Sequence, residues 1–294
     1  MPVLPHKLYS HSIGLVPLTV CFTLAYHLFS FSSLSATTTT TPTIPHIFSS
    51  FPFFFTSRKT HISTPAMTTA AAIVVPAATK HTATFIFLHG LGDTGAGWSS
   101  ISENFRLRRK FDECTFIFPH APRIPVDLNM GMRMPSWFNL YTLSDMGARE
   151  DESGMLSSVE KVHGIIQEQI DKGIASERII LGGFSQGGAV ALLSGLTCKH
   201  KLGGIAALST WLPLSKKIAS MTQDANKGTS IFQAHGEIDT VVRFKWGQDT
   251  KAILQEELHQ PVEWHSYPDL DHSAEPQEIM DMERWMLKII ADQA

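Results

Sequence analysis

The sequence has 294 residues, of which 43% are hydrophobic and 17% charged, and its formal net charge is −3. This length suits a single α/β domain of about 200–250 residues, and the apolar content excludes a chain that is disordered throughout. A charge so close to zero argues against nucleic-acid binding, which needs clustered positive charge. The three cysteines, Cys21, Cys114 and Cys198, cannot form a disulfide framework, and no Cys-x-x-Cys pair indicates a metal or redox site.

The first 66 residues differ in composition from the rest of the chain. They contain no Asp or Glu, three basic residues and 21 Ser or Thr, which is typical of an organellar transit peptide. The apolar stretch 13–31, followed by the small residues at 33–36, favours a secretory signal almost as well. A membrane anchor is less favoured because polar residues and a proline interrupt that stretch. A further alternative is that translation starts at Met67.

These alternatives divide the chain in the same way. We expect a disordered leader over 1–66 and a folded domain over 67–294. A protein that starts at Met67 would be cytoplasmic, whereas the leader would direct it to a plastid or into the secretory pathway.

From about Thr82 onward, short β-branched or aromatic runs alternate with helical periodicity. Strands are predicted at 84–89, 114–118, 178–182, 204–209, 230–234 and 262–267. Helices are predicted at about 155–170, 186–196, 246–258 and 276–290. This alternation predicts a mostly parallel, doubly wound α/β sheet with helices on both faces. Functional residues should then lie on loops at the carboxyl ends of the strands.

One of these loops carries a nucleophile motif. Gly183-Phe-Ser-Gln-Gly187 matches Gly-x-Ser-x-Gly and lies between a predicted strand and a predicted helix. A serine on such a tight turn needs a glycine on either side, because a Cβ there would collide with neighbouring backbone. The amino end of the following helix also stabilises negative charge near the serine. The sequence therefore predicts Ser185 as a catalytic nucleophile.

The partners of such a serine follow it in the order acid, then histidine. Asp239 and His272 each follow a predicted strand, so His272 is expected to accept the serine proton and Asp239 to orient the imidazole. Asp269 and Asp271 compete for the acid role, but they lie too close to the histidine in sequence to reach the far nitrogen of its ring. His235 is a weaker candidate for the base because it precedes Asp239 by only four residues.

Acyl transfer also needs hydrogen-bond donors for the developing oxyanion. The backbone N–H of Gln186 follows the nucleophile directly, and Leu91, in the loop after the strand at 84–89, is the expected second donor. The same loop contains Gly90-Leu-Gly-Asp-Thr-Gly95, which is formally the Gly-x-Gly-x-x-Gly pattern of a dinucleotide site. The next strand is not followed by the acidic residue that such a site places about 20 residues on. We therefore expect no cofactor.

Methionine and aromatic residues gather in two further loops, at 129–138 and 211–213. Trp137, Trp211 and Met134 are candidates to line an acyl channel, because thioethers and aromatic rings suit a flexible apolar pocket. Burial of the two tryptophans in the core is at least as consistent with the sequence.

Together these motifs resemble the acyl-protein thioesterase family, also called the lysophospholipase/carboxylesterase family of α/β-hydrolases. The resemblance runs from about Pro76 to the C-terminus and rests on segments 87–95, 119–122, 135–138, 150–154, 178–188 and 211–213 and on the loops around His235 and His272. It implies an α/β-hydrolase fold without a separate cap domain, in which 67–294 is the catalytic domain. The triad carries over onto Ser185, Asp239 and His272, and the oxyanion donors onto Leu91 and Gln186.

The resemblance also implies an activity. Members of this family are cytosolic serine hydrolases that cleave acyl thioesters and oxygen esters without a cofactor or metal. Their substrates include S-palmitoylated proteins, lysophospholipids and small esters, so we expect acylated partners, at most transient contact with membrane surfaces, and a monomer or weak dimer.

Two departures from the family pattern bear on the acyl chain. Thr240 replaces the proline that usually follows the triad acid, and the loop at 269–276 is similar to that of a plant carboxylesterase-like branch. That branch suggests a short-chain carboxylesterase or deacetylase as an alternative. A small-molecule receptor on a hydrolase scaffold is a less favoured alternative, because a receptor has no need to retain a complete triad.

Overall fold

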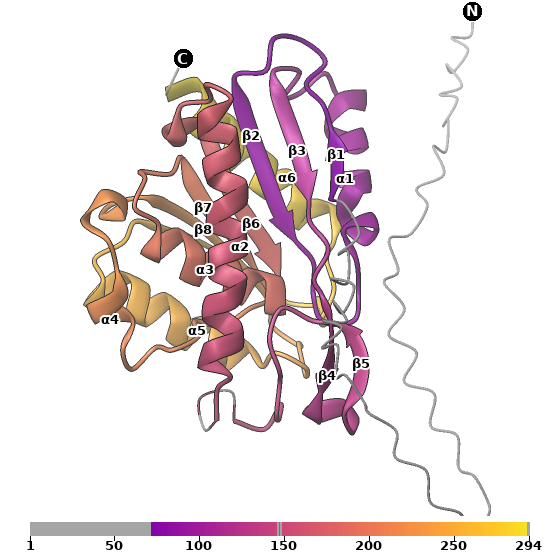
Figure 1. Ribbon diagram of the computed structural model, residues 1–294, viewed down its shortest axis with the longest axis vertical. Helices are drawn as coiled ribbons and strands as arrows, with labels where there is room; N and C mark the ends of the chain where they lie inside the picture. The colour runs from indigo at the N-terminus through magenta and orange to yellow at the C-terminus, as the bar shows by residue number, and fades with distance from the viewer. Residues whose placement is uncertain (1–71, 146, 148, 293–294) are drawn as a thin grey trace, which may run out of the picture. The chain divides into compact units, whose positions relative to one another are not determined.

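The computed structural model describes residues 72–145, 147 and 149–292, so the leader expected at 1–66 lies outside the described residues. Seven strands form one sheet in the order β1-β3-β2-β6-β7-β8-β9 (Figure 1). Their bounds are β1 Ile73–Val75, β2 Ala83–Leu88, β3 Cys114–Phe118, β6 Ile179–Phe184, β7 Gly204–Leu208, β8 Ser230–Gly236 and β9 Val262–Tyr267. β1 pairs antiparallel with β3, and every other pair is parallel. The predicted mostly parallel sheet is thus confirmed.

Four neighbouring strands are buried along their whole length because both faces of the sheet are covered. Every residue of β2, β3, β6 and β7 is buried. Parallel strands covered on both faces read as continuous apolar runs without alternation, which is why Thr84 to Leu88 could be recognised as a strand.

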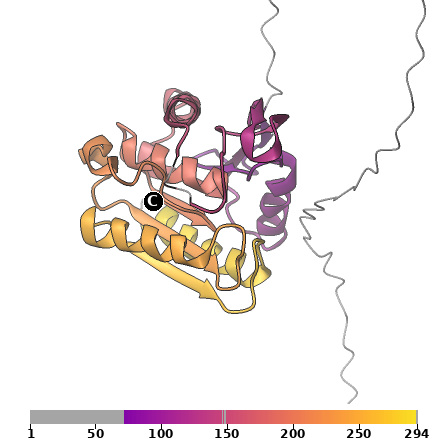
Figure 2. The ribbon, with the colours of Figure 1, turned by 90° about the horizontal axis from the view of Figure 1, so that it is seen from below.

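Helices cover both faces of this sheet. α2 (Glu152–Asp171) and α3 (Gln186–Thr197) pack on one face, and α1 (Gly95–Leu107) and α6 (Pro276–Asp292) pack on the other. Figure 1 shows α2 and α3 in front of the sheet with α6 behind it, and Figure 2 shows α2 end-on beside α3. Each face therefore has its own apolar core.

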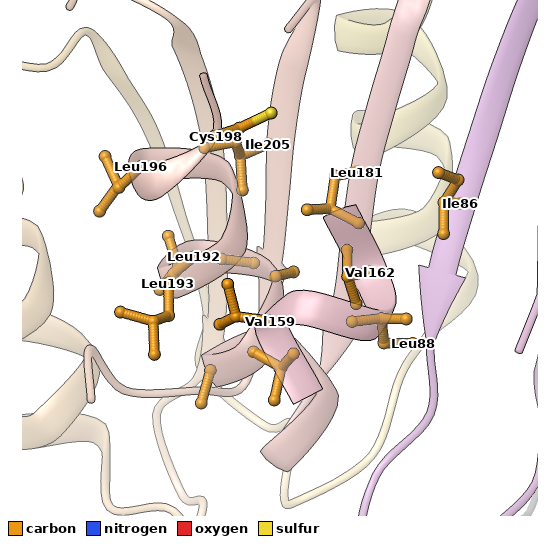
Figure 3. Packing of buried hydrophobic residues seen from close by; sticks show 14 of the residues in the cluster. Ile86, Leu88, Val159, Val162, Leu181, Leu192, Leu193, Leu196, Cys198 and Ile205 are labelled. Carbon is orange, nitrogen blue, oxygen red and sulfur yellow. The ribbon is translucent and has the colours of Figure 1, made fainter. Parts of the chain in front are cut away.

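The core on the α2 and α3 face is mainly aliphatic. Figure 3 shows Val159 and Val162 of α2 in one cluster with Leu181 of β6 and Leu88 of β2. The side chain of Asp151 caps α2 by accepting a hydrogen bond from the N–H of Gly154 at 3.0 Å. A carboxylate at this end of the helix also suits the helix dipole.

Some elements were not predicted from the sequence. These are β1, α1, the short helix α4 (Ile218–Met221), and the antiparallel hairpin of β4 (Arg123–Val126) and β5 (Met132–Pro135). α1 contains two glycines and three serines, which lower its helix propensity. Its buried residues Trp98, Ile101 and Phe105 nevertheless lie at helical spacing.

The boundaries of several predicted elements also move, and two of these shifts bear on the site or on the helix geometry. The helix predicted at 246–258 begins at Phe244 as α5 (Phe244–Ala252), and its last turn, Ile253–Glu257, is a π-helix. β8 continues to Gly236, two residues beyond the prediction, and thereby includes His235. Within the described ranges, no helix has both the length and the apolar content needed to cross a membrane.

Candidate active site

The serine of the Gly-x-Ser-x-Gly motif lies on a sharp turn between β6 and α3. Ser185 has φ 53° and ψ −123°, a strained conformation for a residue with a side chain. A Cβ on Gly183 would lie 2.4 Å from the carbonyl carbon of Gly187, and a Cβ on Gly187 would lie 2.2 Å from the carbonyl oxygen of Leu88. Both flanking positions therefore require glycine, as the motif predicts.

Loops that follow three strands bring the predicted triad together. The Nε2 atom of His272 lies 2.9 Å from the Oγ atom of Ser185, and its Nδ1 atom lies 2.7 Å from the Oδ2 atom of Asp239. The side chain of His272 is 8% exposed and that of Asp239 is fully buried. A continuous chain of hydrogen bonds thus runs from the carboxylate through the imidazole to the serine hydroxyl.

The carboxylate of Asp239 is held by the turn that follows it. Its Oδ1 atom accepts hydrogen bonds from the N–H groups of Val241 and Val242, both at 2.9 Å, which leaves Oδ2 for the imidazole. The competing acids Asp269 and Asp271 are exposed, and Asp271 accepts a hydrogen bond from the hydroxyl of its neighbour Ser273 at 2.5 Å. The structure therefore places Asp239 against the base, and not its rivals.

Aromatic packing against the imidazole was missed by the sequence analysis. The ring of Phe184 lies 4.8 Å from that of His272, centroid to centroid, and Trp98 lies 5.1 Å behind Phe184. Phe184 is the variable residue before the serine in the motif, so the pattern alone gives no signal for this contact.

Two backbone N–H groups are free beside Ser185. The N–H of Gln186 is the first in α3 and has no helical partner. The N–H of Leu91 has no hydrogen-bond acceptor within the described part of the chain. The neighbouring Gly90 is close to the serine, since a Cβ on it would lie 3.4 Å from the Cβ of Ser185. Both predicted oxyanion donors are therefore unpaired among the described residues, one directly after the nucleophile and one directly after the glycine that packs against it.

The side chain of Gln186 connects α3 to the segment after β5. Its Oε1 atom accepts a hydrogen bond from the N–H of Trp137 at 3.0 Å, and its Nε2 atom donates to the carbonyl of Phe138 at 2.8 Å. The indole N–H of Trp137 in turn donates to the carbonyl of His89 at 2.8 Å. These bonds hold the two loops that carry the free N–H groups in fixed relative positions.

His89 fixes the other side of the same loop. Its Nε2 atom accepts a hydrogen bond from the N–H of Ala121 at 3.0 Å, so the ring proton is on Nδ1, which donates to the carbonyl of Gly90 at 2.7 Å. Burial lowers the pKa of His89, which agrees with a neutral ring in this structural role.

The three candidate substrate-binding residues lie in different environments. Trp137 and Trp211 are 3% and 5% exposed and belong to the core beneath α2 and α3. Met134 is half-buried in β5, where its sulfur lies 3.1 Å from the Nδ2 atom of Asn129. Both tryptophans thus pack in the core, and their contact with an acyl chain stays a prediction.

The described cysteines have no place in this site. Cys114 and Cys198 are buried free thiols, and burial raises the pKa of both. In the part of the chain that the structure describes, no cluster of three or more His, Cys, Asp or Glu could hold a metal ion.

A parallel sheet with a serine on the β6–α3 turn, and an acid and a histidine on loops after β8 and β9, defines an α/β-hydrolase. The family model described as Phospholipase/Carboxylesterase matches residues 69–290. The chain belongs to this phospholipase/carboxylesterase family, and it is a carboxylic ester hydrolase.

Known proteins of this family are similar over most of the described chain. A protein of Gibberella zeae named acyl-protein thioesterase 1 is 50% identical over 74% of this chain and 95% of its own length. Arabidopsis thaliana SOBER1 is 36% identical, with a TM-score of 0.66 over 71% of this chain and 99% of its own. Zea mays acyl-protein thioesterase 2 is 29% identical, with a TM-score of 0.67 over 74% and 98%. The resemblance and the fold class predicted from the sequence are thereby confirmed.

Proposed function

We propose that this ester hydrolase removes acyl groups from proteins by cleaving thioester bonds, with Ser185 as nucleophile, His272 as base and Asp239 as the residue that orients the base. The observation that carries the proposal is the unbroken hydrogen-bond chain from Asp239 to Ser185 beside two free N–H groups. The names of the similar fungal and maize proteins support the thioester substrate.

The geometry accounts for both halves of the reaction. In acylation, the Nε2 atom of His272 takes the proton of Ser185 as Oγ attacks the acyl carbonyl, and the imidazolium then gives that proton to the leaving thiolate. In deacylation, a water molecule gives its proton to the same Nε2 atom and attacks the acyl carbonyl. The bond between the acyl group and Ser185 then breaks, the imidazolium returns the proton to Oγ, and the fatty acid is released. Asp239 keeps the proton on Nδ1 and stabilises the imidazolium throughout.

The oxyanion of each tetrahedral intermediate forms next to the serine. The N–H groups of Gln186 and Leu91 would donate to it, and the amino end of α3 adds the positive end of the helix dipole. Both donors are backbone groups held by buried hydrogen bonds, so they need no rearrangement as charge develops. We also propose that Met134, Trp137 and Trp211 contact the acyl chain.

A chain-length series tests the substrate. Purified protein is given the same cysteine-containing peptide carrying either an acetyl or a palmitoyl thioester, and thiol release is measured below the critical micelle concentration. Each CH₂ group buried from water contributes about 0.8 kcal/mol, so we expect kcat/KM for the palmitoyl peptide to exceed that for the acetyl peptide by more than about tenfold. His272→Ala is the inactive control.

The opposite order would identify a short-chain carboxylesterase or deacetylase, the alternative that the loop at 269–276 suggests. Hydrolysis of neither peptide would contradict the proposal itself.

We propose that 67–294 is the complete catalytic domain and that 1–66 serves targeting when it is translated. The match to the family model from residue 69 and the start of the sheet at Ile73 support this boundary. The same assay compares the full chain with a form that begins at Met67, and unequal kcat/KM values would argue against the boundary. A product that starts at Met67 would act in the cytoplasm.

A further inference from the structure

A second buried histidine lies beside the triad acid. His235 is the sixth residue of β8 and is fully buried. Its Nε2 atom lies 2.7 Å from the carbonyl oxygen of Val242. A carbonyl only accepts hydrogen bonds, so Nε2 carries the ring proton. Burial lowers the pKa of His235 below its ordinary value, against the opposing influences of the hydrogen bond to Val242 and of the nearby Asp239 carboxylate.

The rest of the ring is enclosed. A Cβ on Gly247 of α5 would lie 2.4 Å from the Nδ1 atom of His235, so the backbone of α5 packs directly against that side of the ring. Nδ1 has no hydrogen-bond partner within the described ranges, and the ring of Phe244 lies 5.9 Å away, edge-on. This enclosure fixes the orientation of the imidazole and explains why residue 247 is glycine.

His235 and Asp239 hold the same residue from two sides. Val242 donates its N–H to the Oδ1 atom of Asp239 and accepts at its carbonyl the N–H of His235. The Nε2 atom of His235 also lies 3.6 Å from the Oδ2 atom of Asp239, which binds His272. The turn from Asp239 to Val242 is therefore closed at its end by His235.

We infer that His235 is a positioning residue for the triad: its Nε2–H fixes the turn from Asp239 to Val242 and thereby aims the Asp239 carboxylate at His272. The inference rests on the proposed function, because it assumes that Asp239 orients the base. His235 is not a second base, since Nε2 is committed to Val242 and Nδ1 is covered by Gly247.

Three substitutions separate the hydrogen bond from the bulk of the ring. Glutamine can place an N–H close to the position of Nε2, whereas asparagine is too short to do so and leucine fills space without a donor. His163→Gln is a matched control. His163 lies on helix α2, and its Nε2 atom is also close to a backbone carbonyl, at 2.8 Å from that of Ser194 on α3. Each variant is assayed for kcat, KM and the pH–rate profile with a p-nitrophenyl ester, and its thermal midpoint is recorded.

Loss of the donor should affect turnover and not binding. Displacement of a catalytic group by about 1 Å costs about 100-fold in rate, so we expect His235→Asn and His235→Leu to lower kcat by about 10- to 100-fold with KM unchanged. A displaced carboxylate stabilises the protonated base less, so the acid limb of the pH–rate profile should move to lower pH. His235→Gln should restore both quantities most of the way, and His163→Gln should change neither.

A double-mutant cycle tests whether His235 acts through Asp239. In the background of Asp239→Asn, the further change His235→Asn should cost almost nothing, because the effects of residues that act as one unit do not add. Additive losses, equal losses in all three His235 variants with an unmoved pH profile, or wild-type kinetics in His235→Asn would each overturn the inference. Failure of the proposed function would appear separately, as activity retained by Ser185→Ala.

Discussion

Replacing Ser185 with alanine should lower kcat for ester hydrolysis by a factor on the order of 10⁵–10⁶, as expected when the nucleophile of a triad is removed. The hydroxyl of Ser185 bonds only to His272 among the described side chains, and the strained turn is set by the flanking glycines. The folded state should therefore persist with a thermal midpoint close to that of the wild type. Initial rates with a p-nitrophenyl ester, measured beside thermal denaturation, check both expectations.

Ser209 provides a matched control for this substitution. It is also buried, also has a positive φ of 44°, and follows β7, the strand next to β6. Its hydroxyl has no hydrogen-bond partner in the described part of the chain, so Ser209→Ala should keep nearly the full rate. A Ser185→Ala variant that retained a tenth of the wild-type rate would show that the nucleophile is misassigned.

The second large effect is expected for Asp239→Asn, which should lower kcat by about 10⁴-fold. The Oδ1 atom is already bound by two backbone N–H groups of the turn, so an asparagine would keep its carbonyl oxygen there and turn its NH₂ group toward His272. Facing a donor, Nδ1 must then be the unprotonated nitrogen, and the proton moves to Nε2. In that tautomer, Nε2 cannot accept the proton of Ser185.

Asp271→Asn serves as the comparison, because Asp271 is adjacent to the base in sequence but exposed to solvent. Screening by water leaves an exposed carboxylate with little influence, so kcat should change by less than about threefold. Greater damage from Asp271→Asn than from Asp239→Asn would contradict the assignment of the acid.

The central sheet could be predicted because the composition of each of its main strands is by itself typical of a buried strand. β2, β3, β6 and β7 are buried on both faces and read as unbroken apolar runs, and α2 shows its buried face at helical spacing. β1 has three residues and pairs only at the edge. Each strand of the β4–β5 hairpin contains an exposed arginine and a proline, which resemble loop composition. The conformation of a short edge element is set by the residues that pack against it in the fold, and these cannot be read from a single sequence.

The same distinction applies to the site. Ser185 could be predicted because the glycines that its turn requires are adjacent in sequence, and the order of acid and histidine narrowed the choice of partners. The contact of Phe184 with His272 joins residues 88 positions apart. The bridge from Gln186 to Trp137 and the enclosure of His235 by α5 are likewise set by packing. Such contacts leave no local pattern, so the supporting residues of the triad emerged only from the structure.

The most direct test of the account is to trap the covalent intermediate. Protein mixed with a palmitoyl-thioester peptide is quenched with acid before the steady state, digested with trypsin and examined by mass spectrometry. We predict that fragmentation of the tryptic peptide 179–199, which also contains Ser194 and Cys198, places one palmitoyl group on Ser185. The adduct should appear at the rate of thiol release and be absent from Ser185→Ala. Turnover without an adduct on Ser185, or an adduct on Cys114, Cys198 or another serine, would contradict the account.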